Sequence, residues 1–271
     1  MNELLDAWPI LLALVGVGVV AGVLAGLLGV GGGIVIVPAL YFLLPVFGVS
    51  PGSAMAIAVA TSLATIVPTS IASLHAHAAR GNVRWDIITW WGGFILLAAV
   101  LGSLFSVRVN AQWLTYLFAL IAILVSLKML FQPKTAAVVK TLPGKAIQAV
   151  LAGLIGLLSV MIGIGGGTIG VPTLSALNLP THQAVGTAAS FGLLIALPGA
   201  VTLLLAGQAP PDAPVGNWGL INMPAFLCIV PLTVLFAPIG VRLGARLNQL
   251  QLKKVFAVVL VITGVRMLIT A

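Results

Sequence analysis

Two stretches of the sequence, GLLGVGGGIVIVPAL at 26–40 and VMIGIGGGTIGVPTL at 160–174, decide the fold. They align at one constant offset, so that four glycines and a proline coincide: Gly29, Gly31, Gly32, Gly33 and Pro38 with Gly163, Gly165, Gly166, Gly167 and Pro172. Two further matches follow in the same order, AVATS (58–62) with AVGTA (184–188) and residues 102–130 with 240–268. Three ordered matches predict an internal repeat. We expect a first half at 1–132, a linker at 133–143 and a second half at 144–271.

The composition around these stretches predicts a membrane protein. Hydrophobic residues make up 61% of the chain and charged residues only 6%, whereas a soluble domain is about one quarter charged. The apolar runs are 8–29, 33–47, 53–74, 86–107 and 111–131, then 144–164, 168–178, 183–206, 219–240 and 250–270. Most approach the roughly 20 residues that a transmembrane helix needs, but 33–47 and 168–178 are shorter. We predict an all-α polytopic protein with about five helical segments per half, broken or re-entrant at the Gly-rich motifs.

The distribution of Lys and Arg predicts the orientation. Basic residues gather in the 75–85 loop, around the central linker and in the 242–254 loop. These three regions lie on the same side of the membrane if each half crosses it an odd number of times. Loops rich in Lys and Arg face the cytoplasm, so that side is the cytoplasmic one. The two halves are then inverted, with the N-terminus outside and the linker cytoplasmic. We expect a multi-pass protein of the bacterial inner (plasma) membrane, in contact with the lipid bilayer. Glu3 and Asp6 are unlike the start of a signal peptide, so the first run is expected to be retained.

The charged and reactive residues argue against several classes of function. The net charge of +8 does not indicate nucleic acid, because the basic residues lie at segment ends without interleaved aromatic residues. A single cysteine, Cys228, excludes an intramolecular disulfide and a Cys-based zinc site. Hydrolase, metalloprotease and P-loop motifs are missing from the sequence, and four acidic residues leave little for acid–base catalysis. We expect neither an enzyme nor a bound cofactor or metal.

The paired Gly-Gly-Gly…Val-Pro motifs resemble those of the sulfite exporter TauE/SafE family of bacterial membrane proteins. The resemblance includes the AVGT stretch (184–187), the loop from His75 through Arg80 to Trp85, and the final ARLNQLQLKKVFAVVLVITGVRML (245–268). It therefore covers nearly the whole chain. The resemblance implies a secondary transporter, an exporter or permease, for sulfite, organosulfonates or related sulfur anions. It does not select one anion.

The Gly-rich motifs predict an anion site. Inverted repeats place the substrate near the membrane midplane, at short Gly-interrupted segments. Glycine lets a ligand approach the backbone, and the free N–H groups and dipole of a helix N-terminus attract an oxyanion. No Asp or Glu lies at midspan, which favours an anion over a cation. The candidate substrate ligands are the glycines at the two helix starts and nearby hydroxyl groups: Gly31, Gly32, Gly33, Thr61, Ser62, Gly165, Gly166, Gly167, Thr168, Thr187 and Ser190.

Other interpretations of these residues stay open. Glycines in membrane helices often serve close packing, and Ser and Thr often bond their own backbone. His182 can carry a proton, since histidine titrates near neutral pH, but the first half has no counterpart. The alternative functions are transport of another small anion or metabolite, a non-transporting membrane scaffold, and an intramembrane enzyme. The sequence leaves the coupling ion and a homo-oligomeric state open.

Overall fold

The computed structural model describes residues 2–131, 143–244 and 249–270, without the side chains of 2–7 and 249–256. Nearly all of the predicted linker at 133–143 lies outside these residues. The helices of the first half are α1 (Asn2–Leu28), α2 (Gly33–Leu43), the 3₁₀ turn η1 (Leu44–Phe47), α3 (Pro51–Ala78), α4 (Trp85–Ser106) and α5 (Ala111–Phe131). The second half contains α6 (Lys145–Met161), α7 (Gly167–Ala176), α8 (Thr181–Leu205), α9 (Met223–Gly244) and α10 (Gln249–Thr270).

The all-α polytopic prediction is confirmed. Among the described residues, six helices are long and apolar enough to cross a membrane. A helix satisfies its backbone polar groups internally, which lipid requires. The helices α2 and α7 have only 11 and 10 residues. At 1.5 Å per residue they are each about 15 Å long, roughly half of the hydrocarbon core.

Three predicted boundaries were wrong. The first helix begins at Asn2, six residues before the predicted run, and α3 continues to Ala78, four residues past its predicted end. The run predicted at 219–240 begins as a helix only at Met223. Before it, β1 (Asn217–Trp218) and β2 (Ile221–Asn222) pair as a short antiparallel hairpin. The predicted run began too early because Leu220 and Ile221 in the hairpin are as apolar as the residues of the helix that follows.

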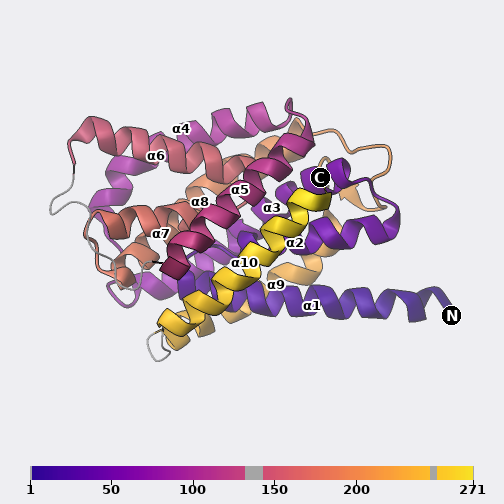
Figure 1. The fold of residues 1–271 in the computed structure, drawn as a ribbon, viewed down its shortest axis with the longest axis horizontal. Coiled ribbons are helices and arrows are strands. Elements are labelled where there is room, and N and C mark those ends of the chain that lie inside the picture. The colour runs from indigo at the N-terminus through magenta and orange to yellow at the C-terminus, as the bar shows by residue number, and fades with distance from the viewer. Residues whose placement is uncertain (1, 132–142, 245–248, 271) are drawn as a thin grey trace.

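Helices α3 and α8 pack together in the centre, and the other helices surround them (Figure 1). The first helix of each half packs on the fourth helix of the other half: α1 on α9, and α6 on α4. Glycines permit these close approaches, since a Cβ on Gly22 would lie 2.8 Å from the Cα of Thr233 and one on Gly156 would overlap the Ile95 carbonyl. These two contacts join aligned positions of the halves. The inverted relation itself stays a prediction.

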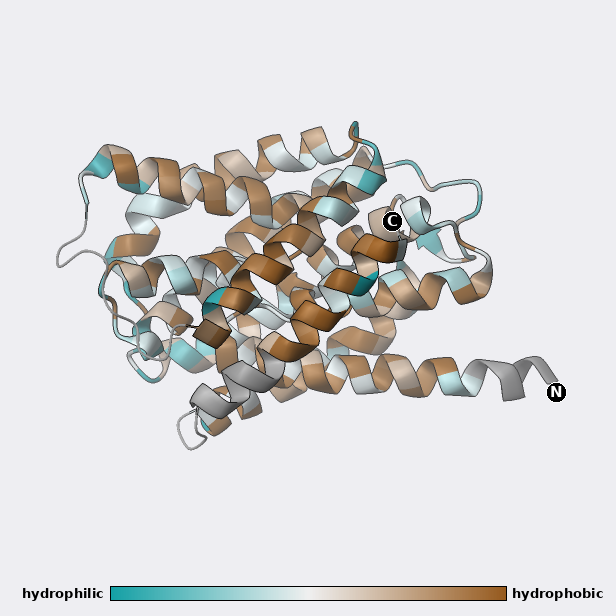
Figure 2. Ribbon diagram, viewed as in Figure 1, coloured by the Kyte–Doolittle hydropathy of each residue, from teal (hydrophilic) through white to brown (hydrophobic). Residues whose placement is uncertain are grey.

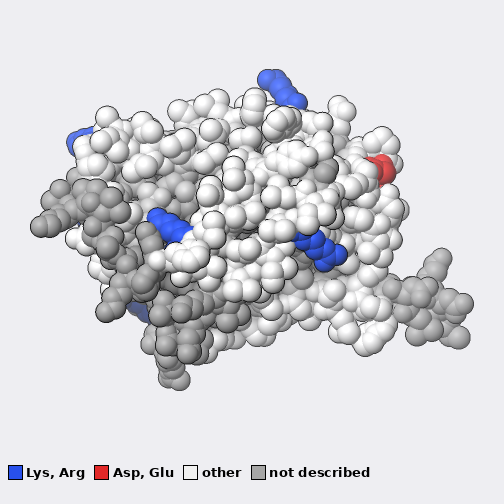
Figure 3. Space-filling view, in the orientation of Figure 1, with Lys and Arg blue, Asp and Glu red and all other residues white. Residues whose placement is uncertain are grey.

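The outer surface is apolar. Large hydrophobic side chains on α4, α5 and α9 are exposed, among them Leu97, Leu101, Leu124, Leu227 and Leu235. Apolar residues dominate the helices, and Lys, Arg and acidic groups are sparse on the face in view (Figures 2 and 3). Four of the five exposed tryptophans lie near the ends of apolar segments, where amphipathic rings meet the membrane interface: Trp8, Trp85, Trp113 and Trp218. Such a surface is compatible with lipid as its solvent.

Candidate functional site

The first Gly-rich break connects α1 to α2. Gly29 follows the last residue of α1 with φ 68°, and its N–H donates to the Ala25 carbonyl at 3.0 Å. Gly31 and Gly32 also have positive φ, 72° and 83°. Only glycine adopts this region without a steric penalty, so three of the four glycines are required by backbone conformation. The chain then begins α2 at Gly33.

The second break, between α6 and α7, has the same spacing of glycines and a different conformation. Gly163 has φ 67° and ends α6 in a Schellman turn, in which Ile164 N–H donates to Ser159 O at 3.0 Å and Gly163 N–H to Val160 O at 3.2 Å. Gly166 has the helical φ of −56°. In this break, among the residues described, Gly163 alone has a positive φ.

The two breaks contact each other. A Cβ built on Gly31 would lie 3.6 Å from the Cα of Gly165, and one on Gly33 would lie 2.5 Å from the Gly163 carbonyl oxygen. A Cβ on Gly167 would overlap the carbonyl oxygen of Gly29. We call the residues 29–33 and 163–167 the glycine junction; all of them are buried. The structure therefore brings the six predicted glycines of the site together, and it places backbone against backbone there.

The helix starts at the junction offer hydrogen-bond donors. The first N–H groups of α2 and α7 have no partner within their helices. In α2, Gly32 O already accepts from the N–H groups of Val35 and Ile36, and in α7, Gly166 O accepts from Gly170. The N–H groups before these positions and the positive end of each helix dipole can hold an anion. This is the chemistry that the sequence predicted for these segments.

Of the predicted hydroxyl groups, two lie at the junction. Ser62, on α3, is fully buried and donates to the Gly163 carbonyl at 2.7 Å. Thr168, in the first turn of α7, is 3% exposed, and its Oγ1 has no hydrogen-bond partner. A buried hydroxyl without a partner is costly, so Thr168 is the side chain here with capacity left for a ligand. Ser190 instead donates to the carbonyl of Thr187 in its own helix at 2.6 Å.

Thr61 and Thr187 hold the starts of other helices. The Oγ1 of Thr61 accepts the N–H of Asn222, just before α9, at 2.9 Å. The Oγ1 of Thr187 accepts the N–H of Arg84, just before α4, at 3.0 Å. Each threonine thereby satisfies a backbone donor at a helix N-terminus of the opposite half. No local feature of the sequence points to Asn222 or Arg84 as the partners of these threonines.

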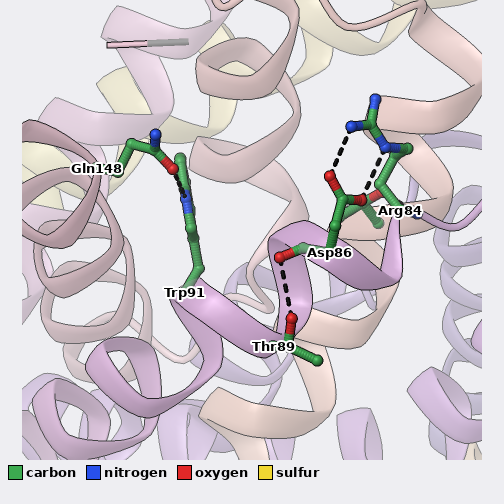
Figure 4. A network of polar contacts seen from close by, with 6 residues as sticks. Arg84, Asp86, Thr89, Trp91 and Gln148 are labelled. Atoms are coloured by element: carbon green, nitrogen blue, oxygen red, sulfur yellow. Dashed lines mark hydrogen bonds and ion pairs between the residues drawn. The ribbon is translucent and has the colours of Figure 1, made fainter. Parts of the chain in front are cut away.

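Around Arg84 the start of α4 carries further polar contacts (Figure 4). Arg84 Nη2 lies 2.6 Å from Asp86 Oδ2, and Arg84 Nε lies 2.8 Å from Oδ1. One helical turn later, Trp91 Nε1 donates to Gln148 Oε1 of α6 at 3.0 Å. The Trp91–Gln148 bond joins α4 to α6, whereas the Arg84–Asp86 pair lies within the start of α4. His182, the predicted proton carrier, is exposed in the first turn of α8 and does not belong to this network or to the junction.

Comparison with known proteins gives a consistent result. The family described as Sulfite exporter TauE/SafE matches residues 14–267. A "Probable membrane transporter protein" of Haemophilus influenzae is 36% identical over 252 residues, 93% of this chain and 95% of the relative. A relative in Methanocaldococcus jannaschii is 26% identical over 270 residues, 93% of both proteins. "Probable membrane transporter protein YunE" of Bacillus subtilis is 26% identical over 283 residues, 94% of this chain and 96% of the relative. No solved structure matches the chain.

Proposed function

The chain belongs to the sulfite exporter TauE/SafE family of membrane transporters, and from this premise we propose that it moves a small sulfur-containing anion across the bacterial inner membrane. Sulfite and organosulfonates are the proposed substrates, and the protein acts as a secondary transporter, an exporter or permease. The names of the relatives specify no substrate, so another small anion or metabolite is the alternative.

The glycine junction carries this proposal. Two short helices, one from each half, begin at the same buried place, and the unpartnered hydroxyl of Thr168 lies in the first turn of one of them. Backbone N–H groups and a hydroxyl are neutral donors, which hold an oxyanion without the strong attraction of a buried Lys or Arg. Of the ligands predicted from sequence, the proposal rests on Gly31 to Gly33, Gly165 to Gly167 and Thr168. The other predicted hydroxyl groups already make hydrogen bonds within the protein: Thr61, Ser62, Thr187 and Ser190.

The electrostatics of the interior favour an anion. The acidic side chains that the structure describes are Asp86, in the first turn of α4, and Asp212, in the loop before β1. Neither lies in the middle of a helix that crosses the membrane. A transporter of cations would be expected to place carboxylates there, because a buried cation needs an opposite charge.

Because the two breaks are in close contact, the anion can bind between them only after they move apart. With Gly33 against the Gly163 carbonyl and Gly167 against that of Gly29, the backbone of one half fills the space beside the other. We propose that the halves 1–132 and 144–271 are inverted repeats which move relative to each other, as in other secondary transporters. The N-terminus is proposed to lie outside and the linker at 133–143 in the cytoplasm, on the basis of the positive charges.

Flux measurements with a matched pair of variants test the proposal. Purified protein in proteoliposomes is expected to move labelled sulfite or the organosulfonate taurine. Thr168→Val should reduce this flux at least about tenfold, since one lost hydrogen bond to a charged ligand is worth about 1.5–3 kcal/mol. Thr173→Val is the control on the same helix, because Thr173 donates to the Ile169 carbonyl in its own helix at 2.7 Å.

Two results would contradict the proposal. Absence of flux for every sulfur oxyanion and sulfonate tested would remove the substrate class. If the protein transports the anion and the Thr168→Val and Thr173→Val variants have equal flux, the glycine junction is not the binding site.

A further inference from the structure

A groove of about 700 Å³ lies between α3 and α9, away from the glycine junction. Its walls are largely apolar, with Ile71 on α3 and Val234 and Pro238 on α9. Three basic side chains reach it at the ends of these helices: His75, Arg80 and Arg242. An apolar groove at which a few charged groups converge has the composition of a small-molecule site.

The two arginines are not balanced by acidic groups. Asp86 pairs with Arg84, and Asp212 accepts the backbone N–H of Ser50 at 2.7 Å, which leaves no other carboxylate side chain in the part of the chain that the structure describes. Arg80 is held beside the groove by donation from Nη1 to the Ala76 carbonyl at 2.9 Å. Arginines at the ends of helices also complement the helix dipoles. That role does not require both to face one cavity from two helices.

The helix α3 carries a polar face, which we define as Ser62, Thr65, Thr69, Ser73 and His77. All five side chains are 5% exposed or less. Four of them contact α1, α9 or the glycine junction: Ser62 reaches Gly163 O, Thr69 reaches Thr233 Oγ1 at 2.7 Å, Ser73 reaches Ala25 O, and the Nε2 of His77 lies 3.0 Å from Gly26 O. The fifth, Thr65, donates to the Ser62 carbonyl of its own helix. At 1.5 Å per residue the face extends about 22 Å, from the junction to the end of α3 that borders the groove.

The second half lacks this face. With Thr61 aligned to Thr187, the five positions fall on residues of α8 that are all apolar: Ala188, Phe191, Ile195, Gly199 and Leu203. Since α8 occupies the equivalent central place with apolar side chains, packing does not demand polar ones on α3. Polar groups buried in a membrane protein are costly and mark pathways for substrates and ions.

The groove and the polar face meet at one hydrogen bond. Thr69 and Thr233 bond to each other. Thr69 directly follows Pro68, Thr233 directly precedes Val234, and both Pro68 and Val234 line the groove. Both walls contain a proline within the helix, Pro68 in α3 and Pro238 in α9. A proline removes a backbone hydrogen bond and allows the helix to bend. The contact between Thr69 and Thr233 therefore lies at the end of the groove nearer to Ser62 and the glycine junction, in two helices that each contain a proline.

We propose that the groove, at the helix ends proposed to face the cytoplasm, is a peripheral binding site for the transported anion, with Arg80 and Arg242 holding its sulfonate or sulfite group and the apolar walls holding any alkyl part. From there the anion reaches the glycine junction along the polar face of α3 once the Thr69–Thr233 contact opens. This inference rests on the proposed function.

Thiol labelling tests the groove without any transport measurement. Ala72→Cys places a thiol in the groove, in a Cys228→Ser background that removes the native thiol. Its reaction rates are measured with an anionic reagent, sulfonatoethyl methanethiosulfonate, and with the cationic trimethylammonium analogue. Arg80→Gln with Arg242→Gln should lower the ratio of anionic to cationic rate about fivefold or more, because converging charges raise the local concentration of the opposite ion. Arg108→Gln, an exposed arginine outside the groove, should leave the ratio unchanged.

Flux separates this inference from the proposed function. Thr69→Val with Thr233→Val keeps the side-chain shape and removes the polar contact; it should slow flux at least about tenfold by making the path apolar. Thr202→Val on α8 is the control. Unchanged labelling ratios and unchanged flux in an active transporter would overturn the inference alone. Protection of the introduced thiol by phosphatidylglycerol, and not by ethanesulfonate, would assign the groove to a lipid headgroup and would also overturn it. Absence of any flux, with the labelling ratio shifted as expected, would count against the proposed function instead.

Discussion

The two Gly-rich breaks share a sequence pattern and use it differently. In the first break, Gly29, Gly31 and Gly32 have positive φ, so the glycines supply backbone conformation. In the second, Gly163 has positive φ, whereas Gly166 is helical and a Cβ on it would overlap that of Phe191. Here Gly166 and Gly167 supply space, as Gly33 does in the first break. An aligned motif thus does not fix the physical role of each residue, because the role depends on the backbone conformation and on what packs against it.

The largest effect is expected where space is smallest, at Gly167. A Cβ there would overlap the Gly29 carbonyl oxygen, which is backbone and cannot rotate away. Gly167→Ala should destabilise the protein by more than about 3 kcal/mol, the upper end for overpacking, and should abolish monodisperse protein in detergent. Gly153→Ala, on α6 with nothing within 4 Å of its Cβ, should be neutral or slightly stabilising. Equal thermal unfolding of the two variants would show that the breaks are not in contact.

The next effect concerns a side chain of α3 that bonds the second break. Ser62 donates to the Gly163 carbonyl, and its aligned position on α8 is Ala188. Ser62→Ala leaves a buried carbonyl unpaired and should cost about 1–3 kcal/mol in thermal unfolding measurements. Ser126→Ala, which removes a bond to the Ala122 carbonyl of the same helix, should cost less because that carbonyl also accepts within the helix. If Ser126→Ala destabilises the protein more than Ser62→Ala does, the bond to the Gly163 carbonyl is not the more important of the two.

A double-mutant cycle separates conformation from space in the first break. Gly31 has φ 72°, and its nearest neighbour is the Cγ2 of Ile66, 3.1 Å from a built Cβ. Gly31→Ala should cost about 1–2 kcal/mol, the penalty of the left-handed region. This cost should persist in an Ile66→Ala background, which removes the neighbour. If it disappears there, the first break is limited by space like the second.

The smallest effect is expected at the surface, where the loop before β1 meets the start of α3. Hydrogen bonding by the Ser53 hydroxyl and by Ser50 lowers the pKa of Asp212 from 3.8 to about 2. Because the folded pKa lies below the unfolded one, the carboxylate stabilises the fold above pH 4, and this contribution is lost as the pH falls toward 2. Asp212→Asn should lower the unfolding temperature slightly at pH 5 and not at pH 2, since the group is solvated. If Asp212→Asn lowers the unfolding temperature more at pH 2 than at pH 5, the ionised carboxylate does not stabilise the fold.

Much of this fold follows from sequence. Apolar length, Pro and Gly punctuation and low charge are local properties, and lipid leaves helices as the way for such segments to satisfy their backbone. They predicted ten segments, two of them short, and the structure contains these ten. They also marked the two breaks by the glycines at 29–33 and 163–167. The polar face of α3 was readable too, as hydroxyls and a histidine repeating every three or four residues from Ser62 to His77, a period typical of one helix face.

Only the tertiary structure decided how these parts are used. It set the two breaks in contact, gave Thr61 and Thr187 the backbone N–H groups of Asn222 and Arg84, and left Thr168 without a partner. The contacts of the breaks and of the two threonines are between residues more than 100 positions apart in the sequence. Thr168 lacks any such partner. Local sequence fixes where a glycine or hydroxyl stands along a helix. The free space and the hydrogen-bond partners beside it are supplied by the other half of the chain.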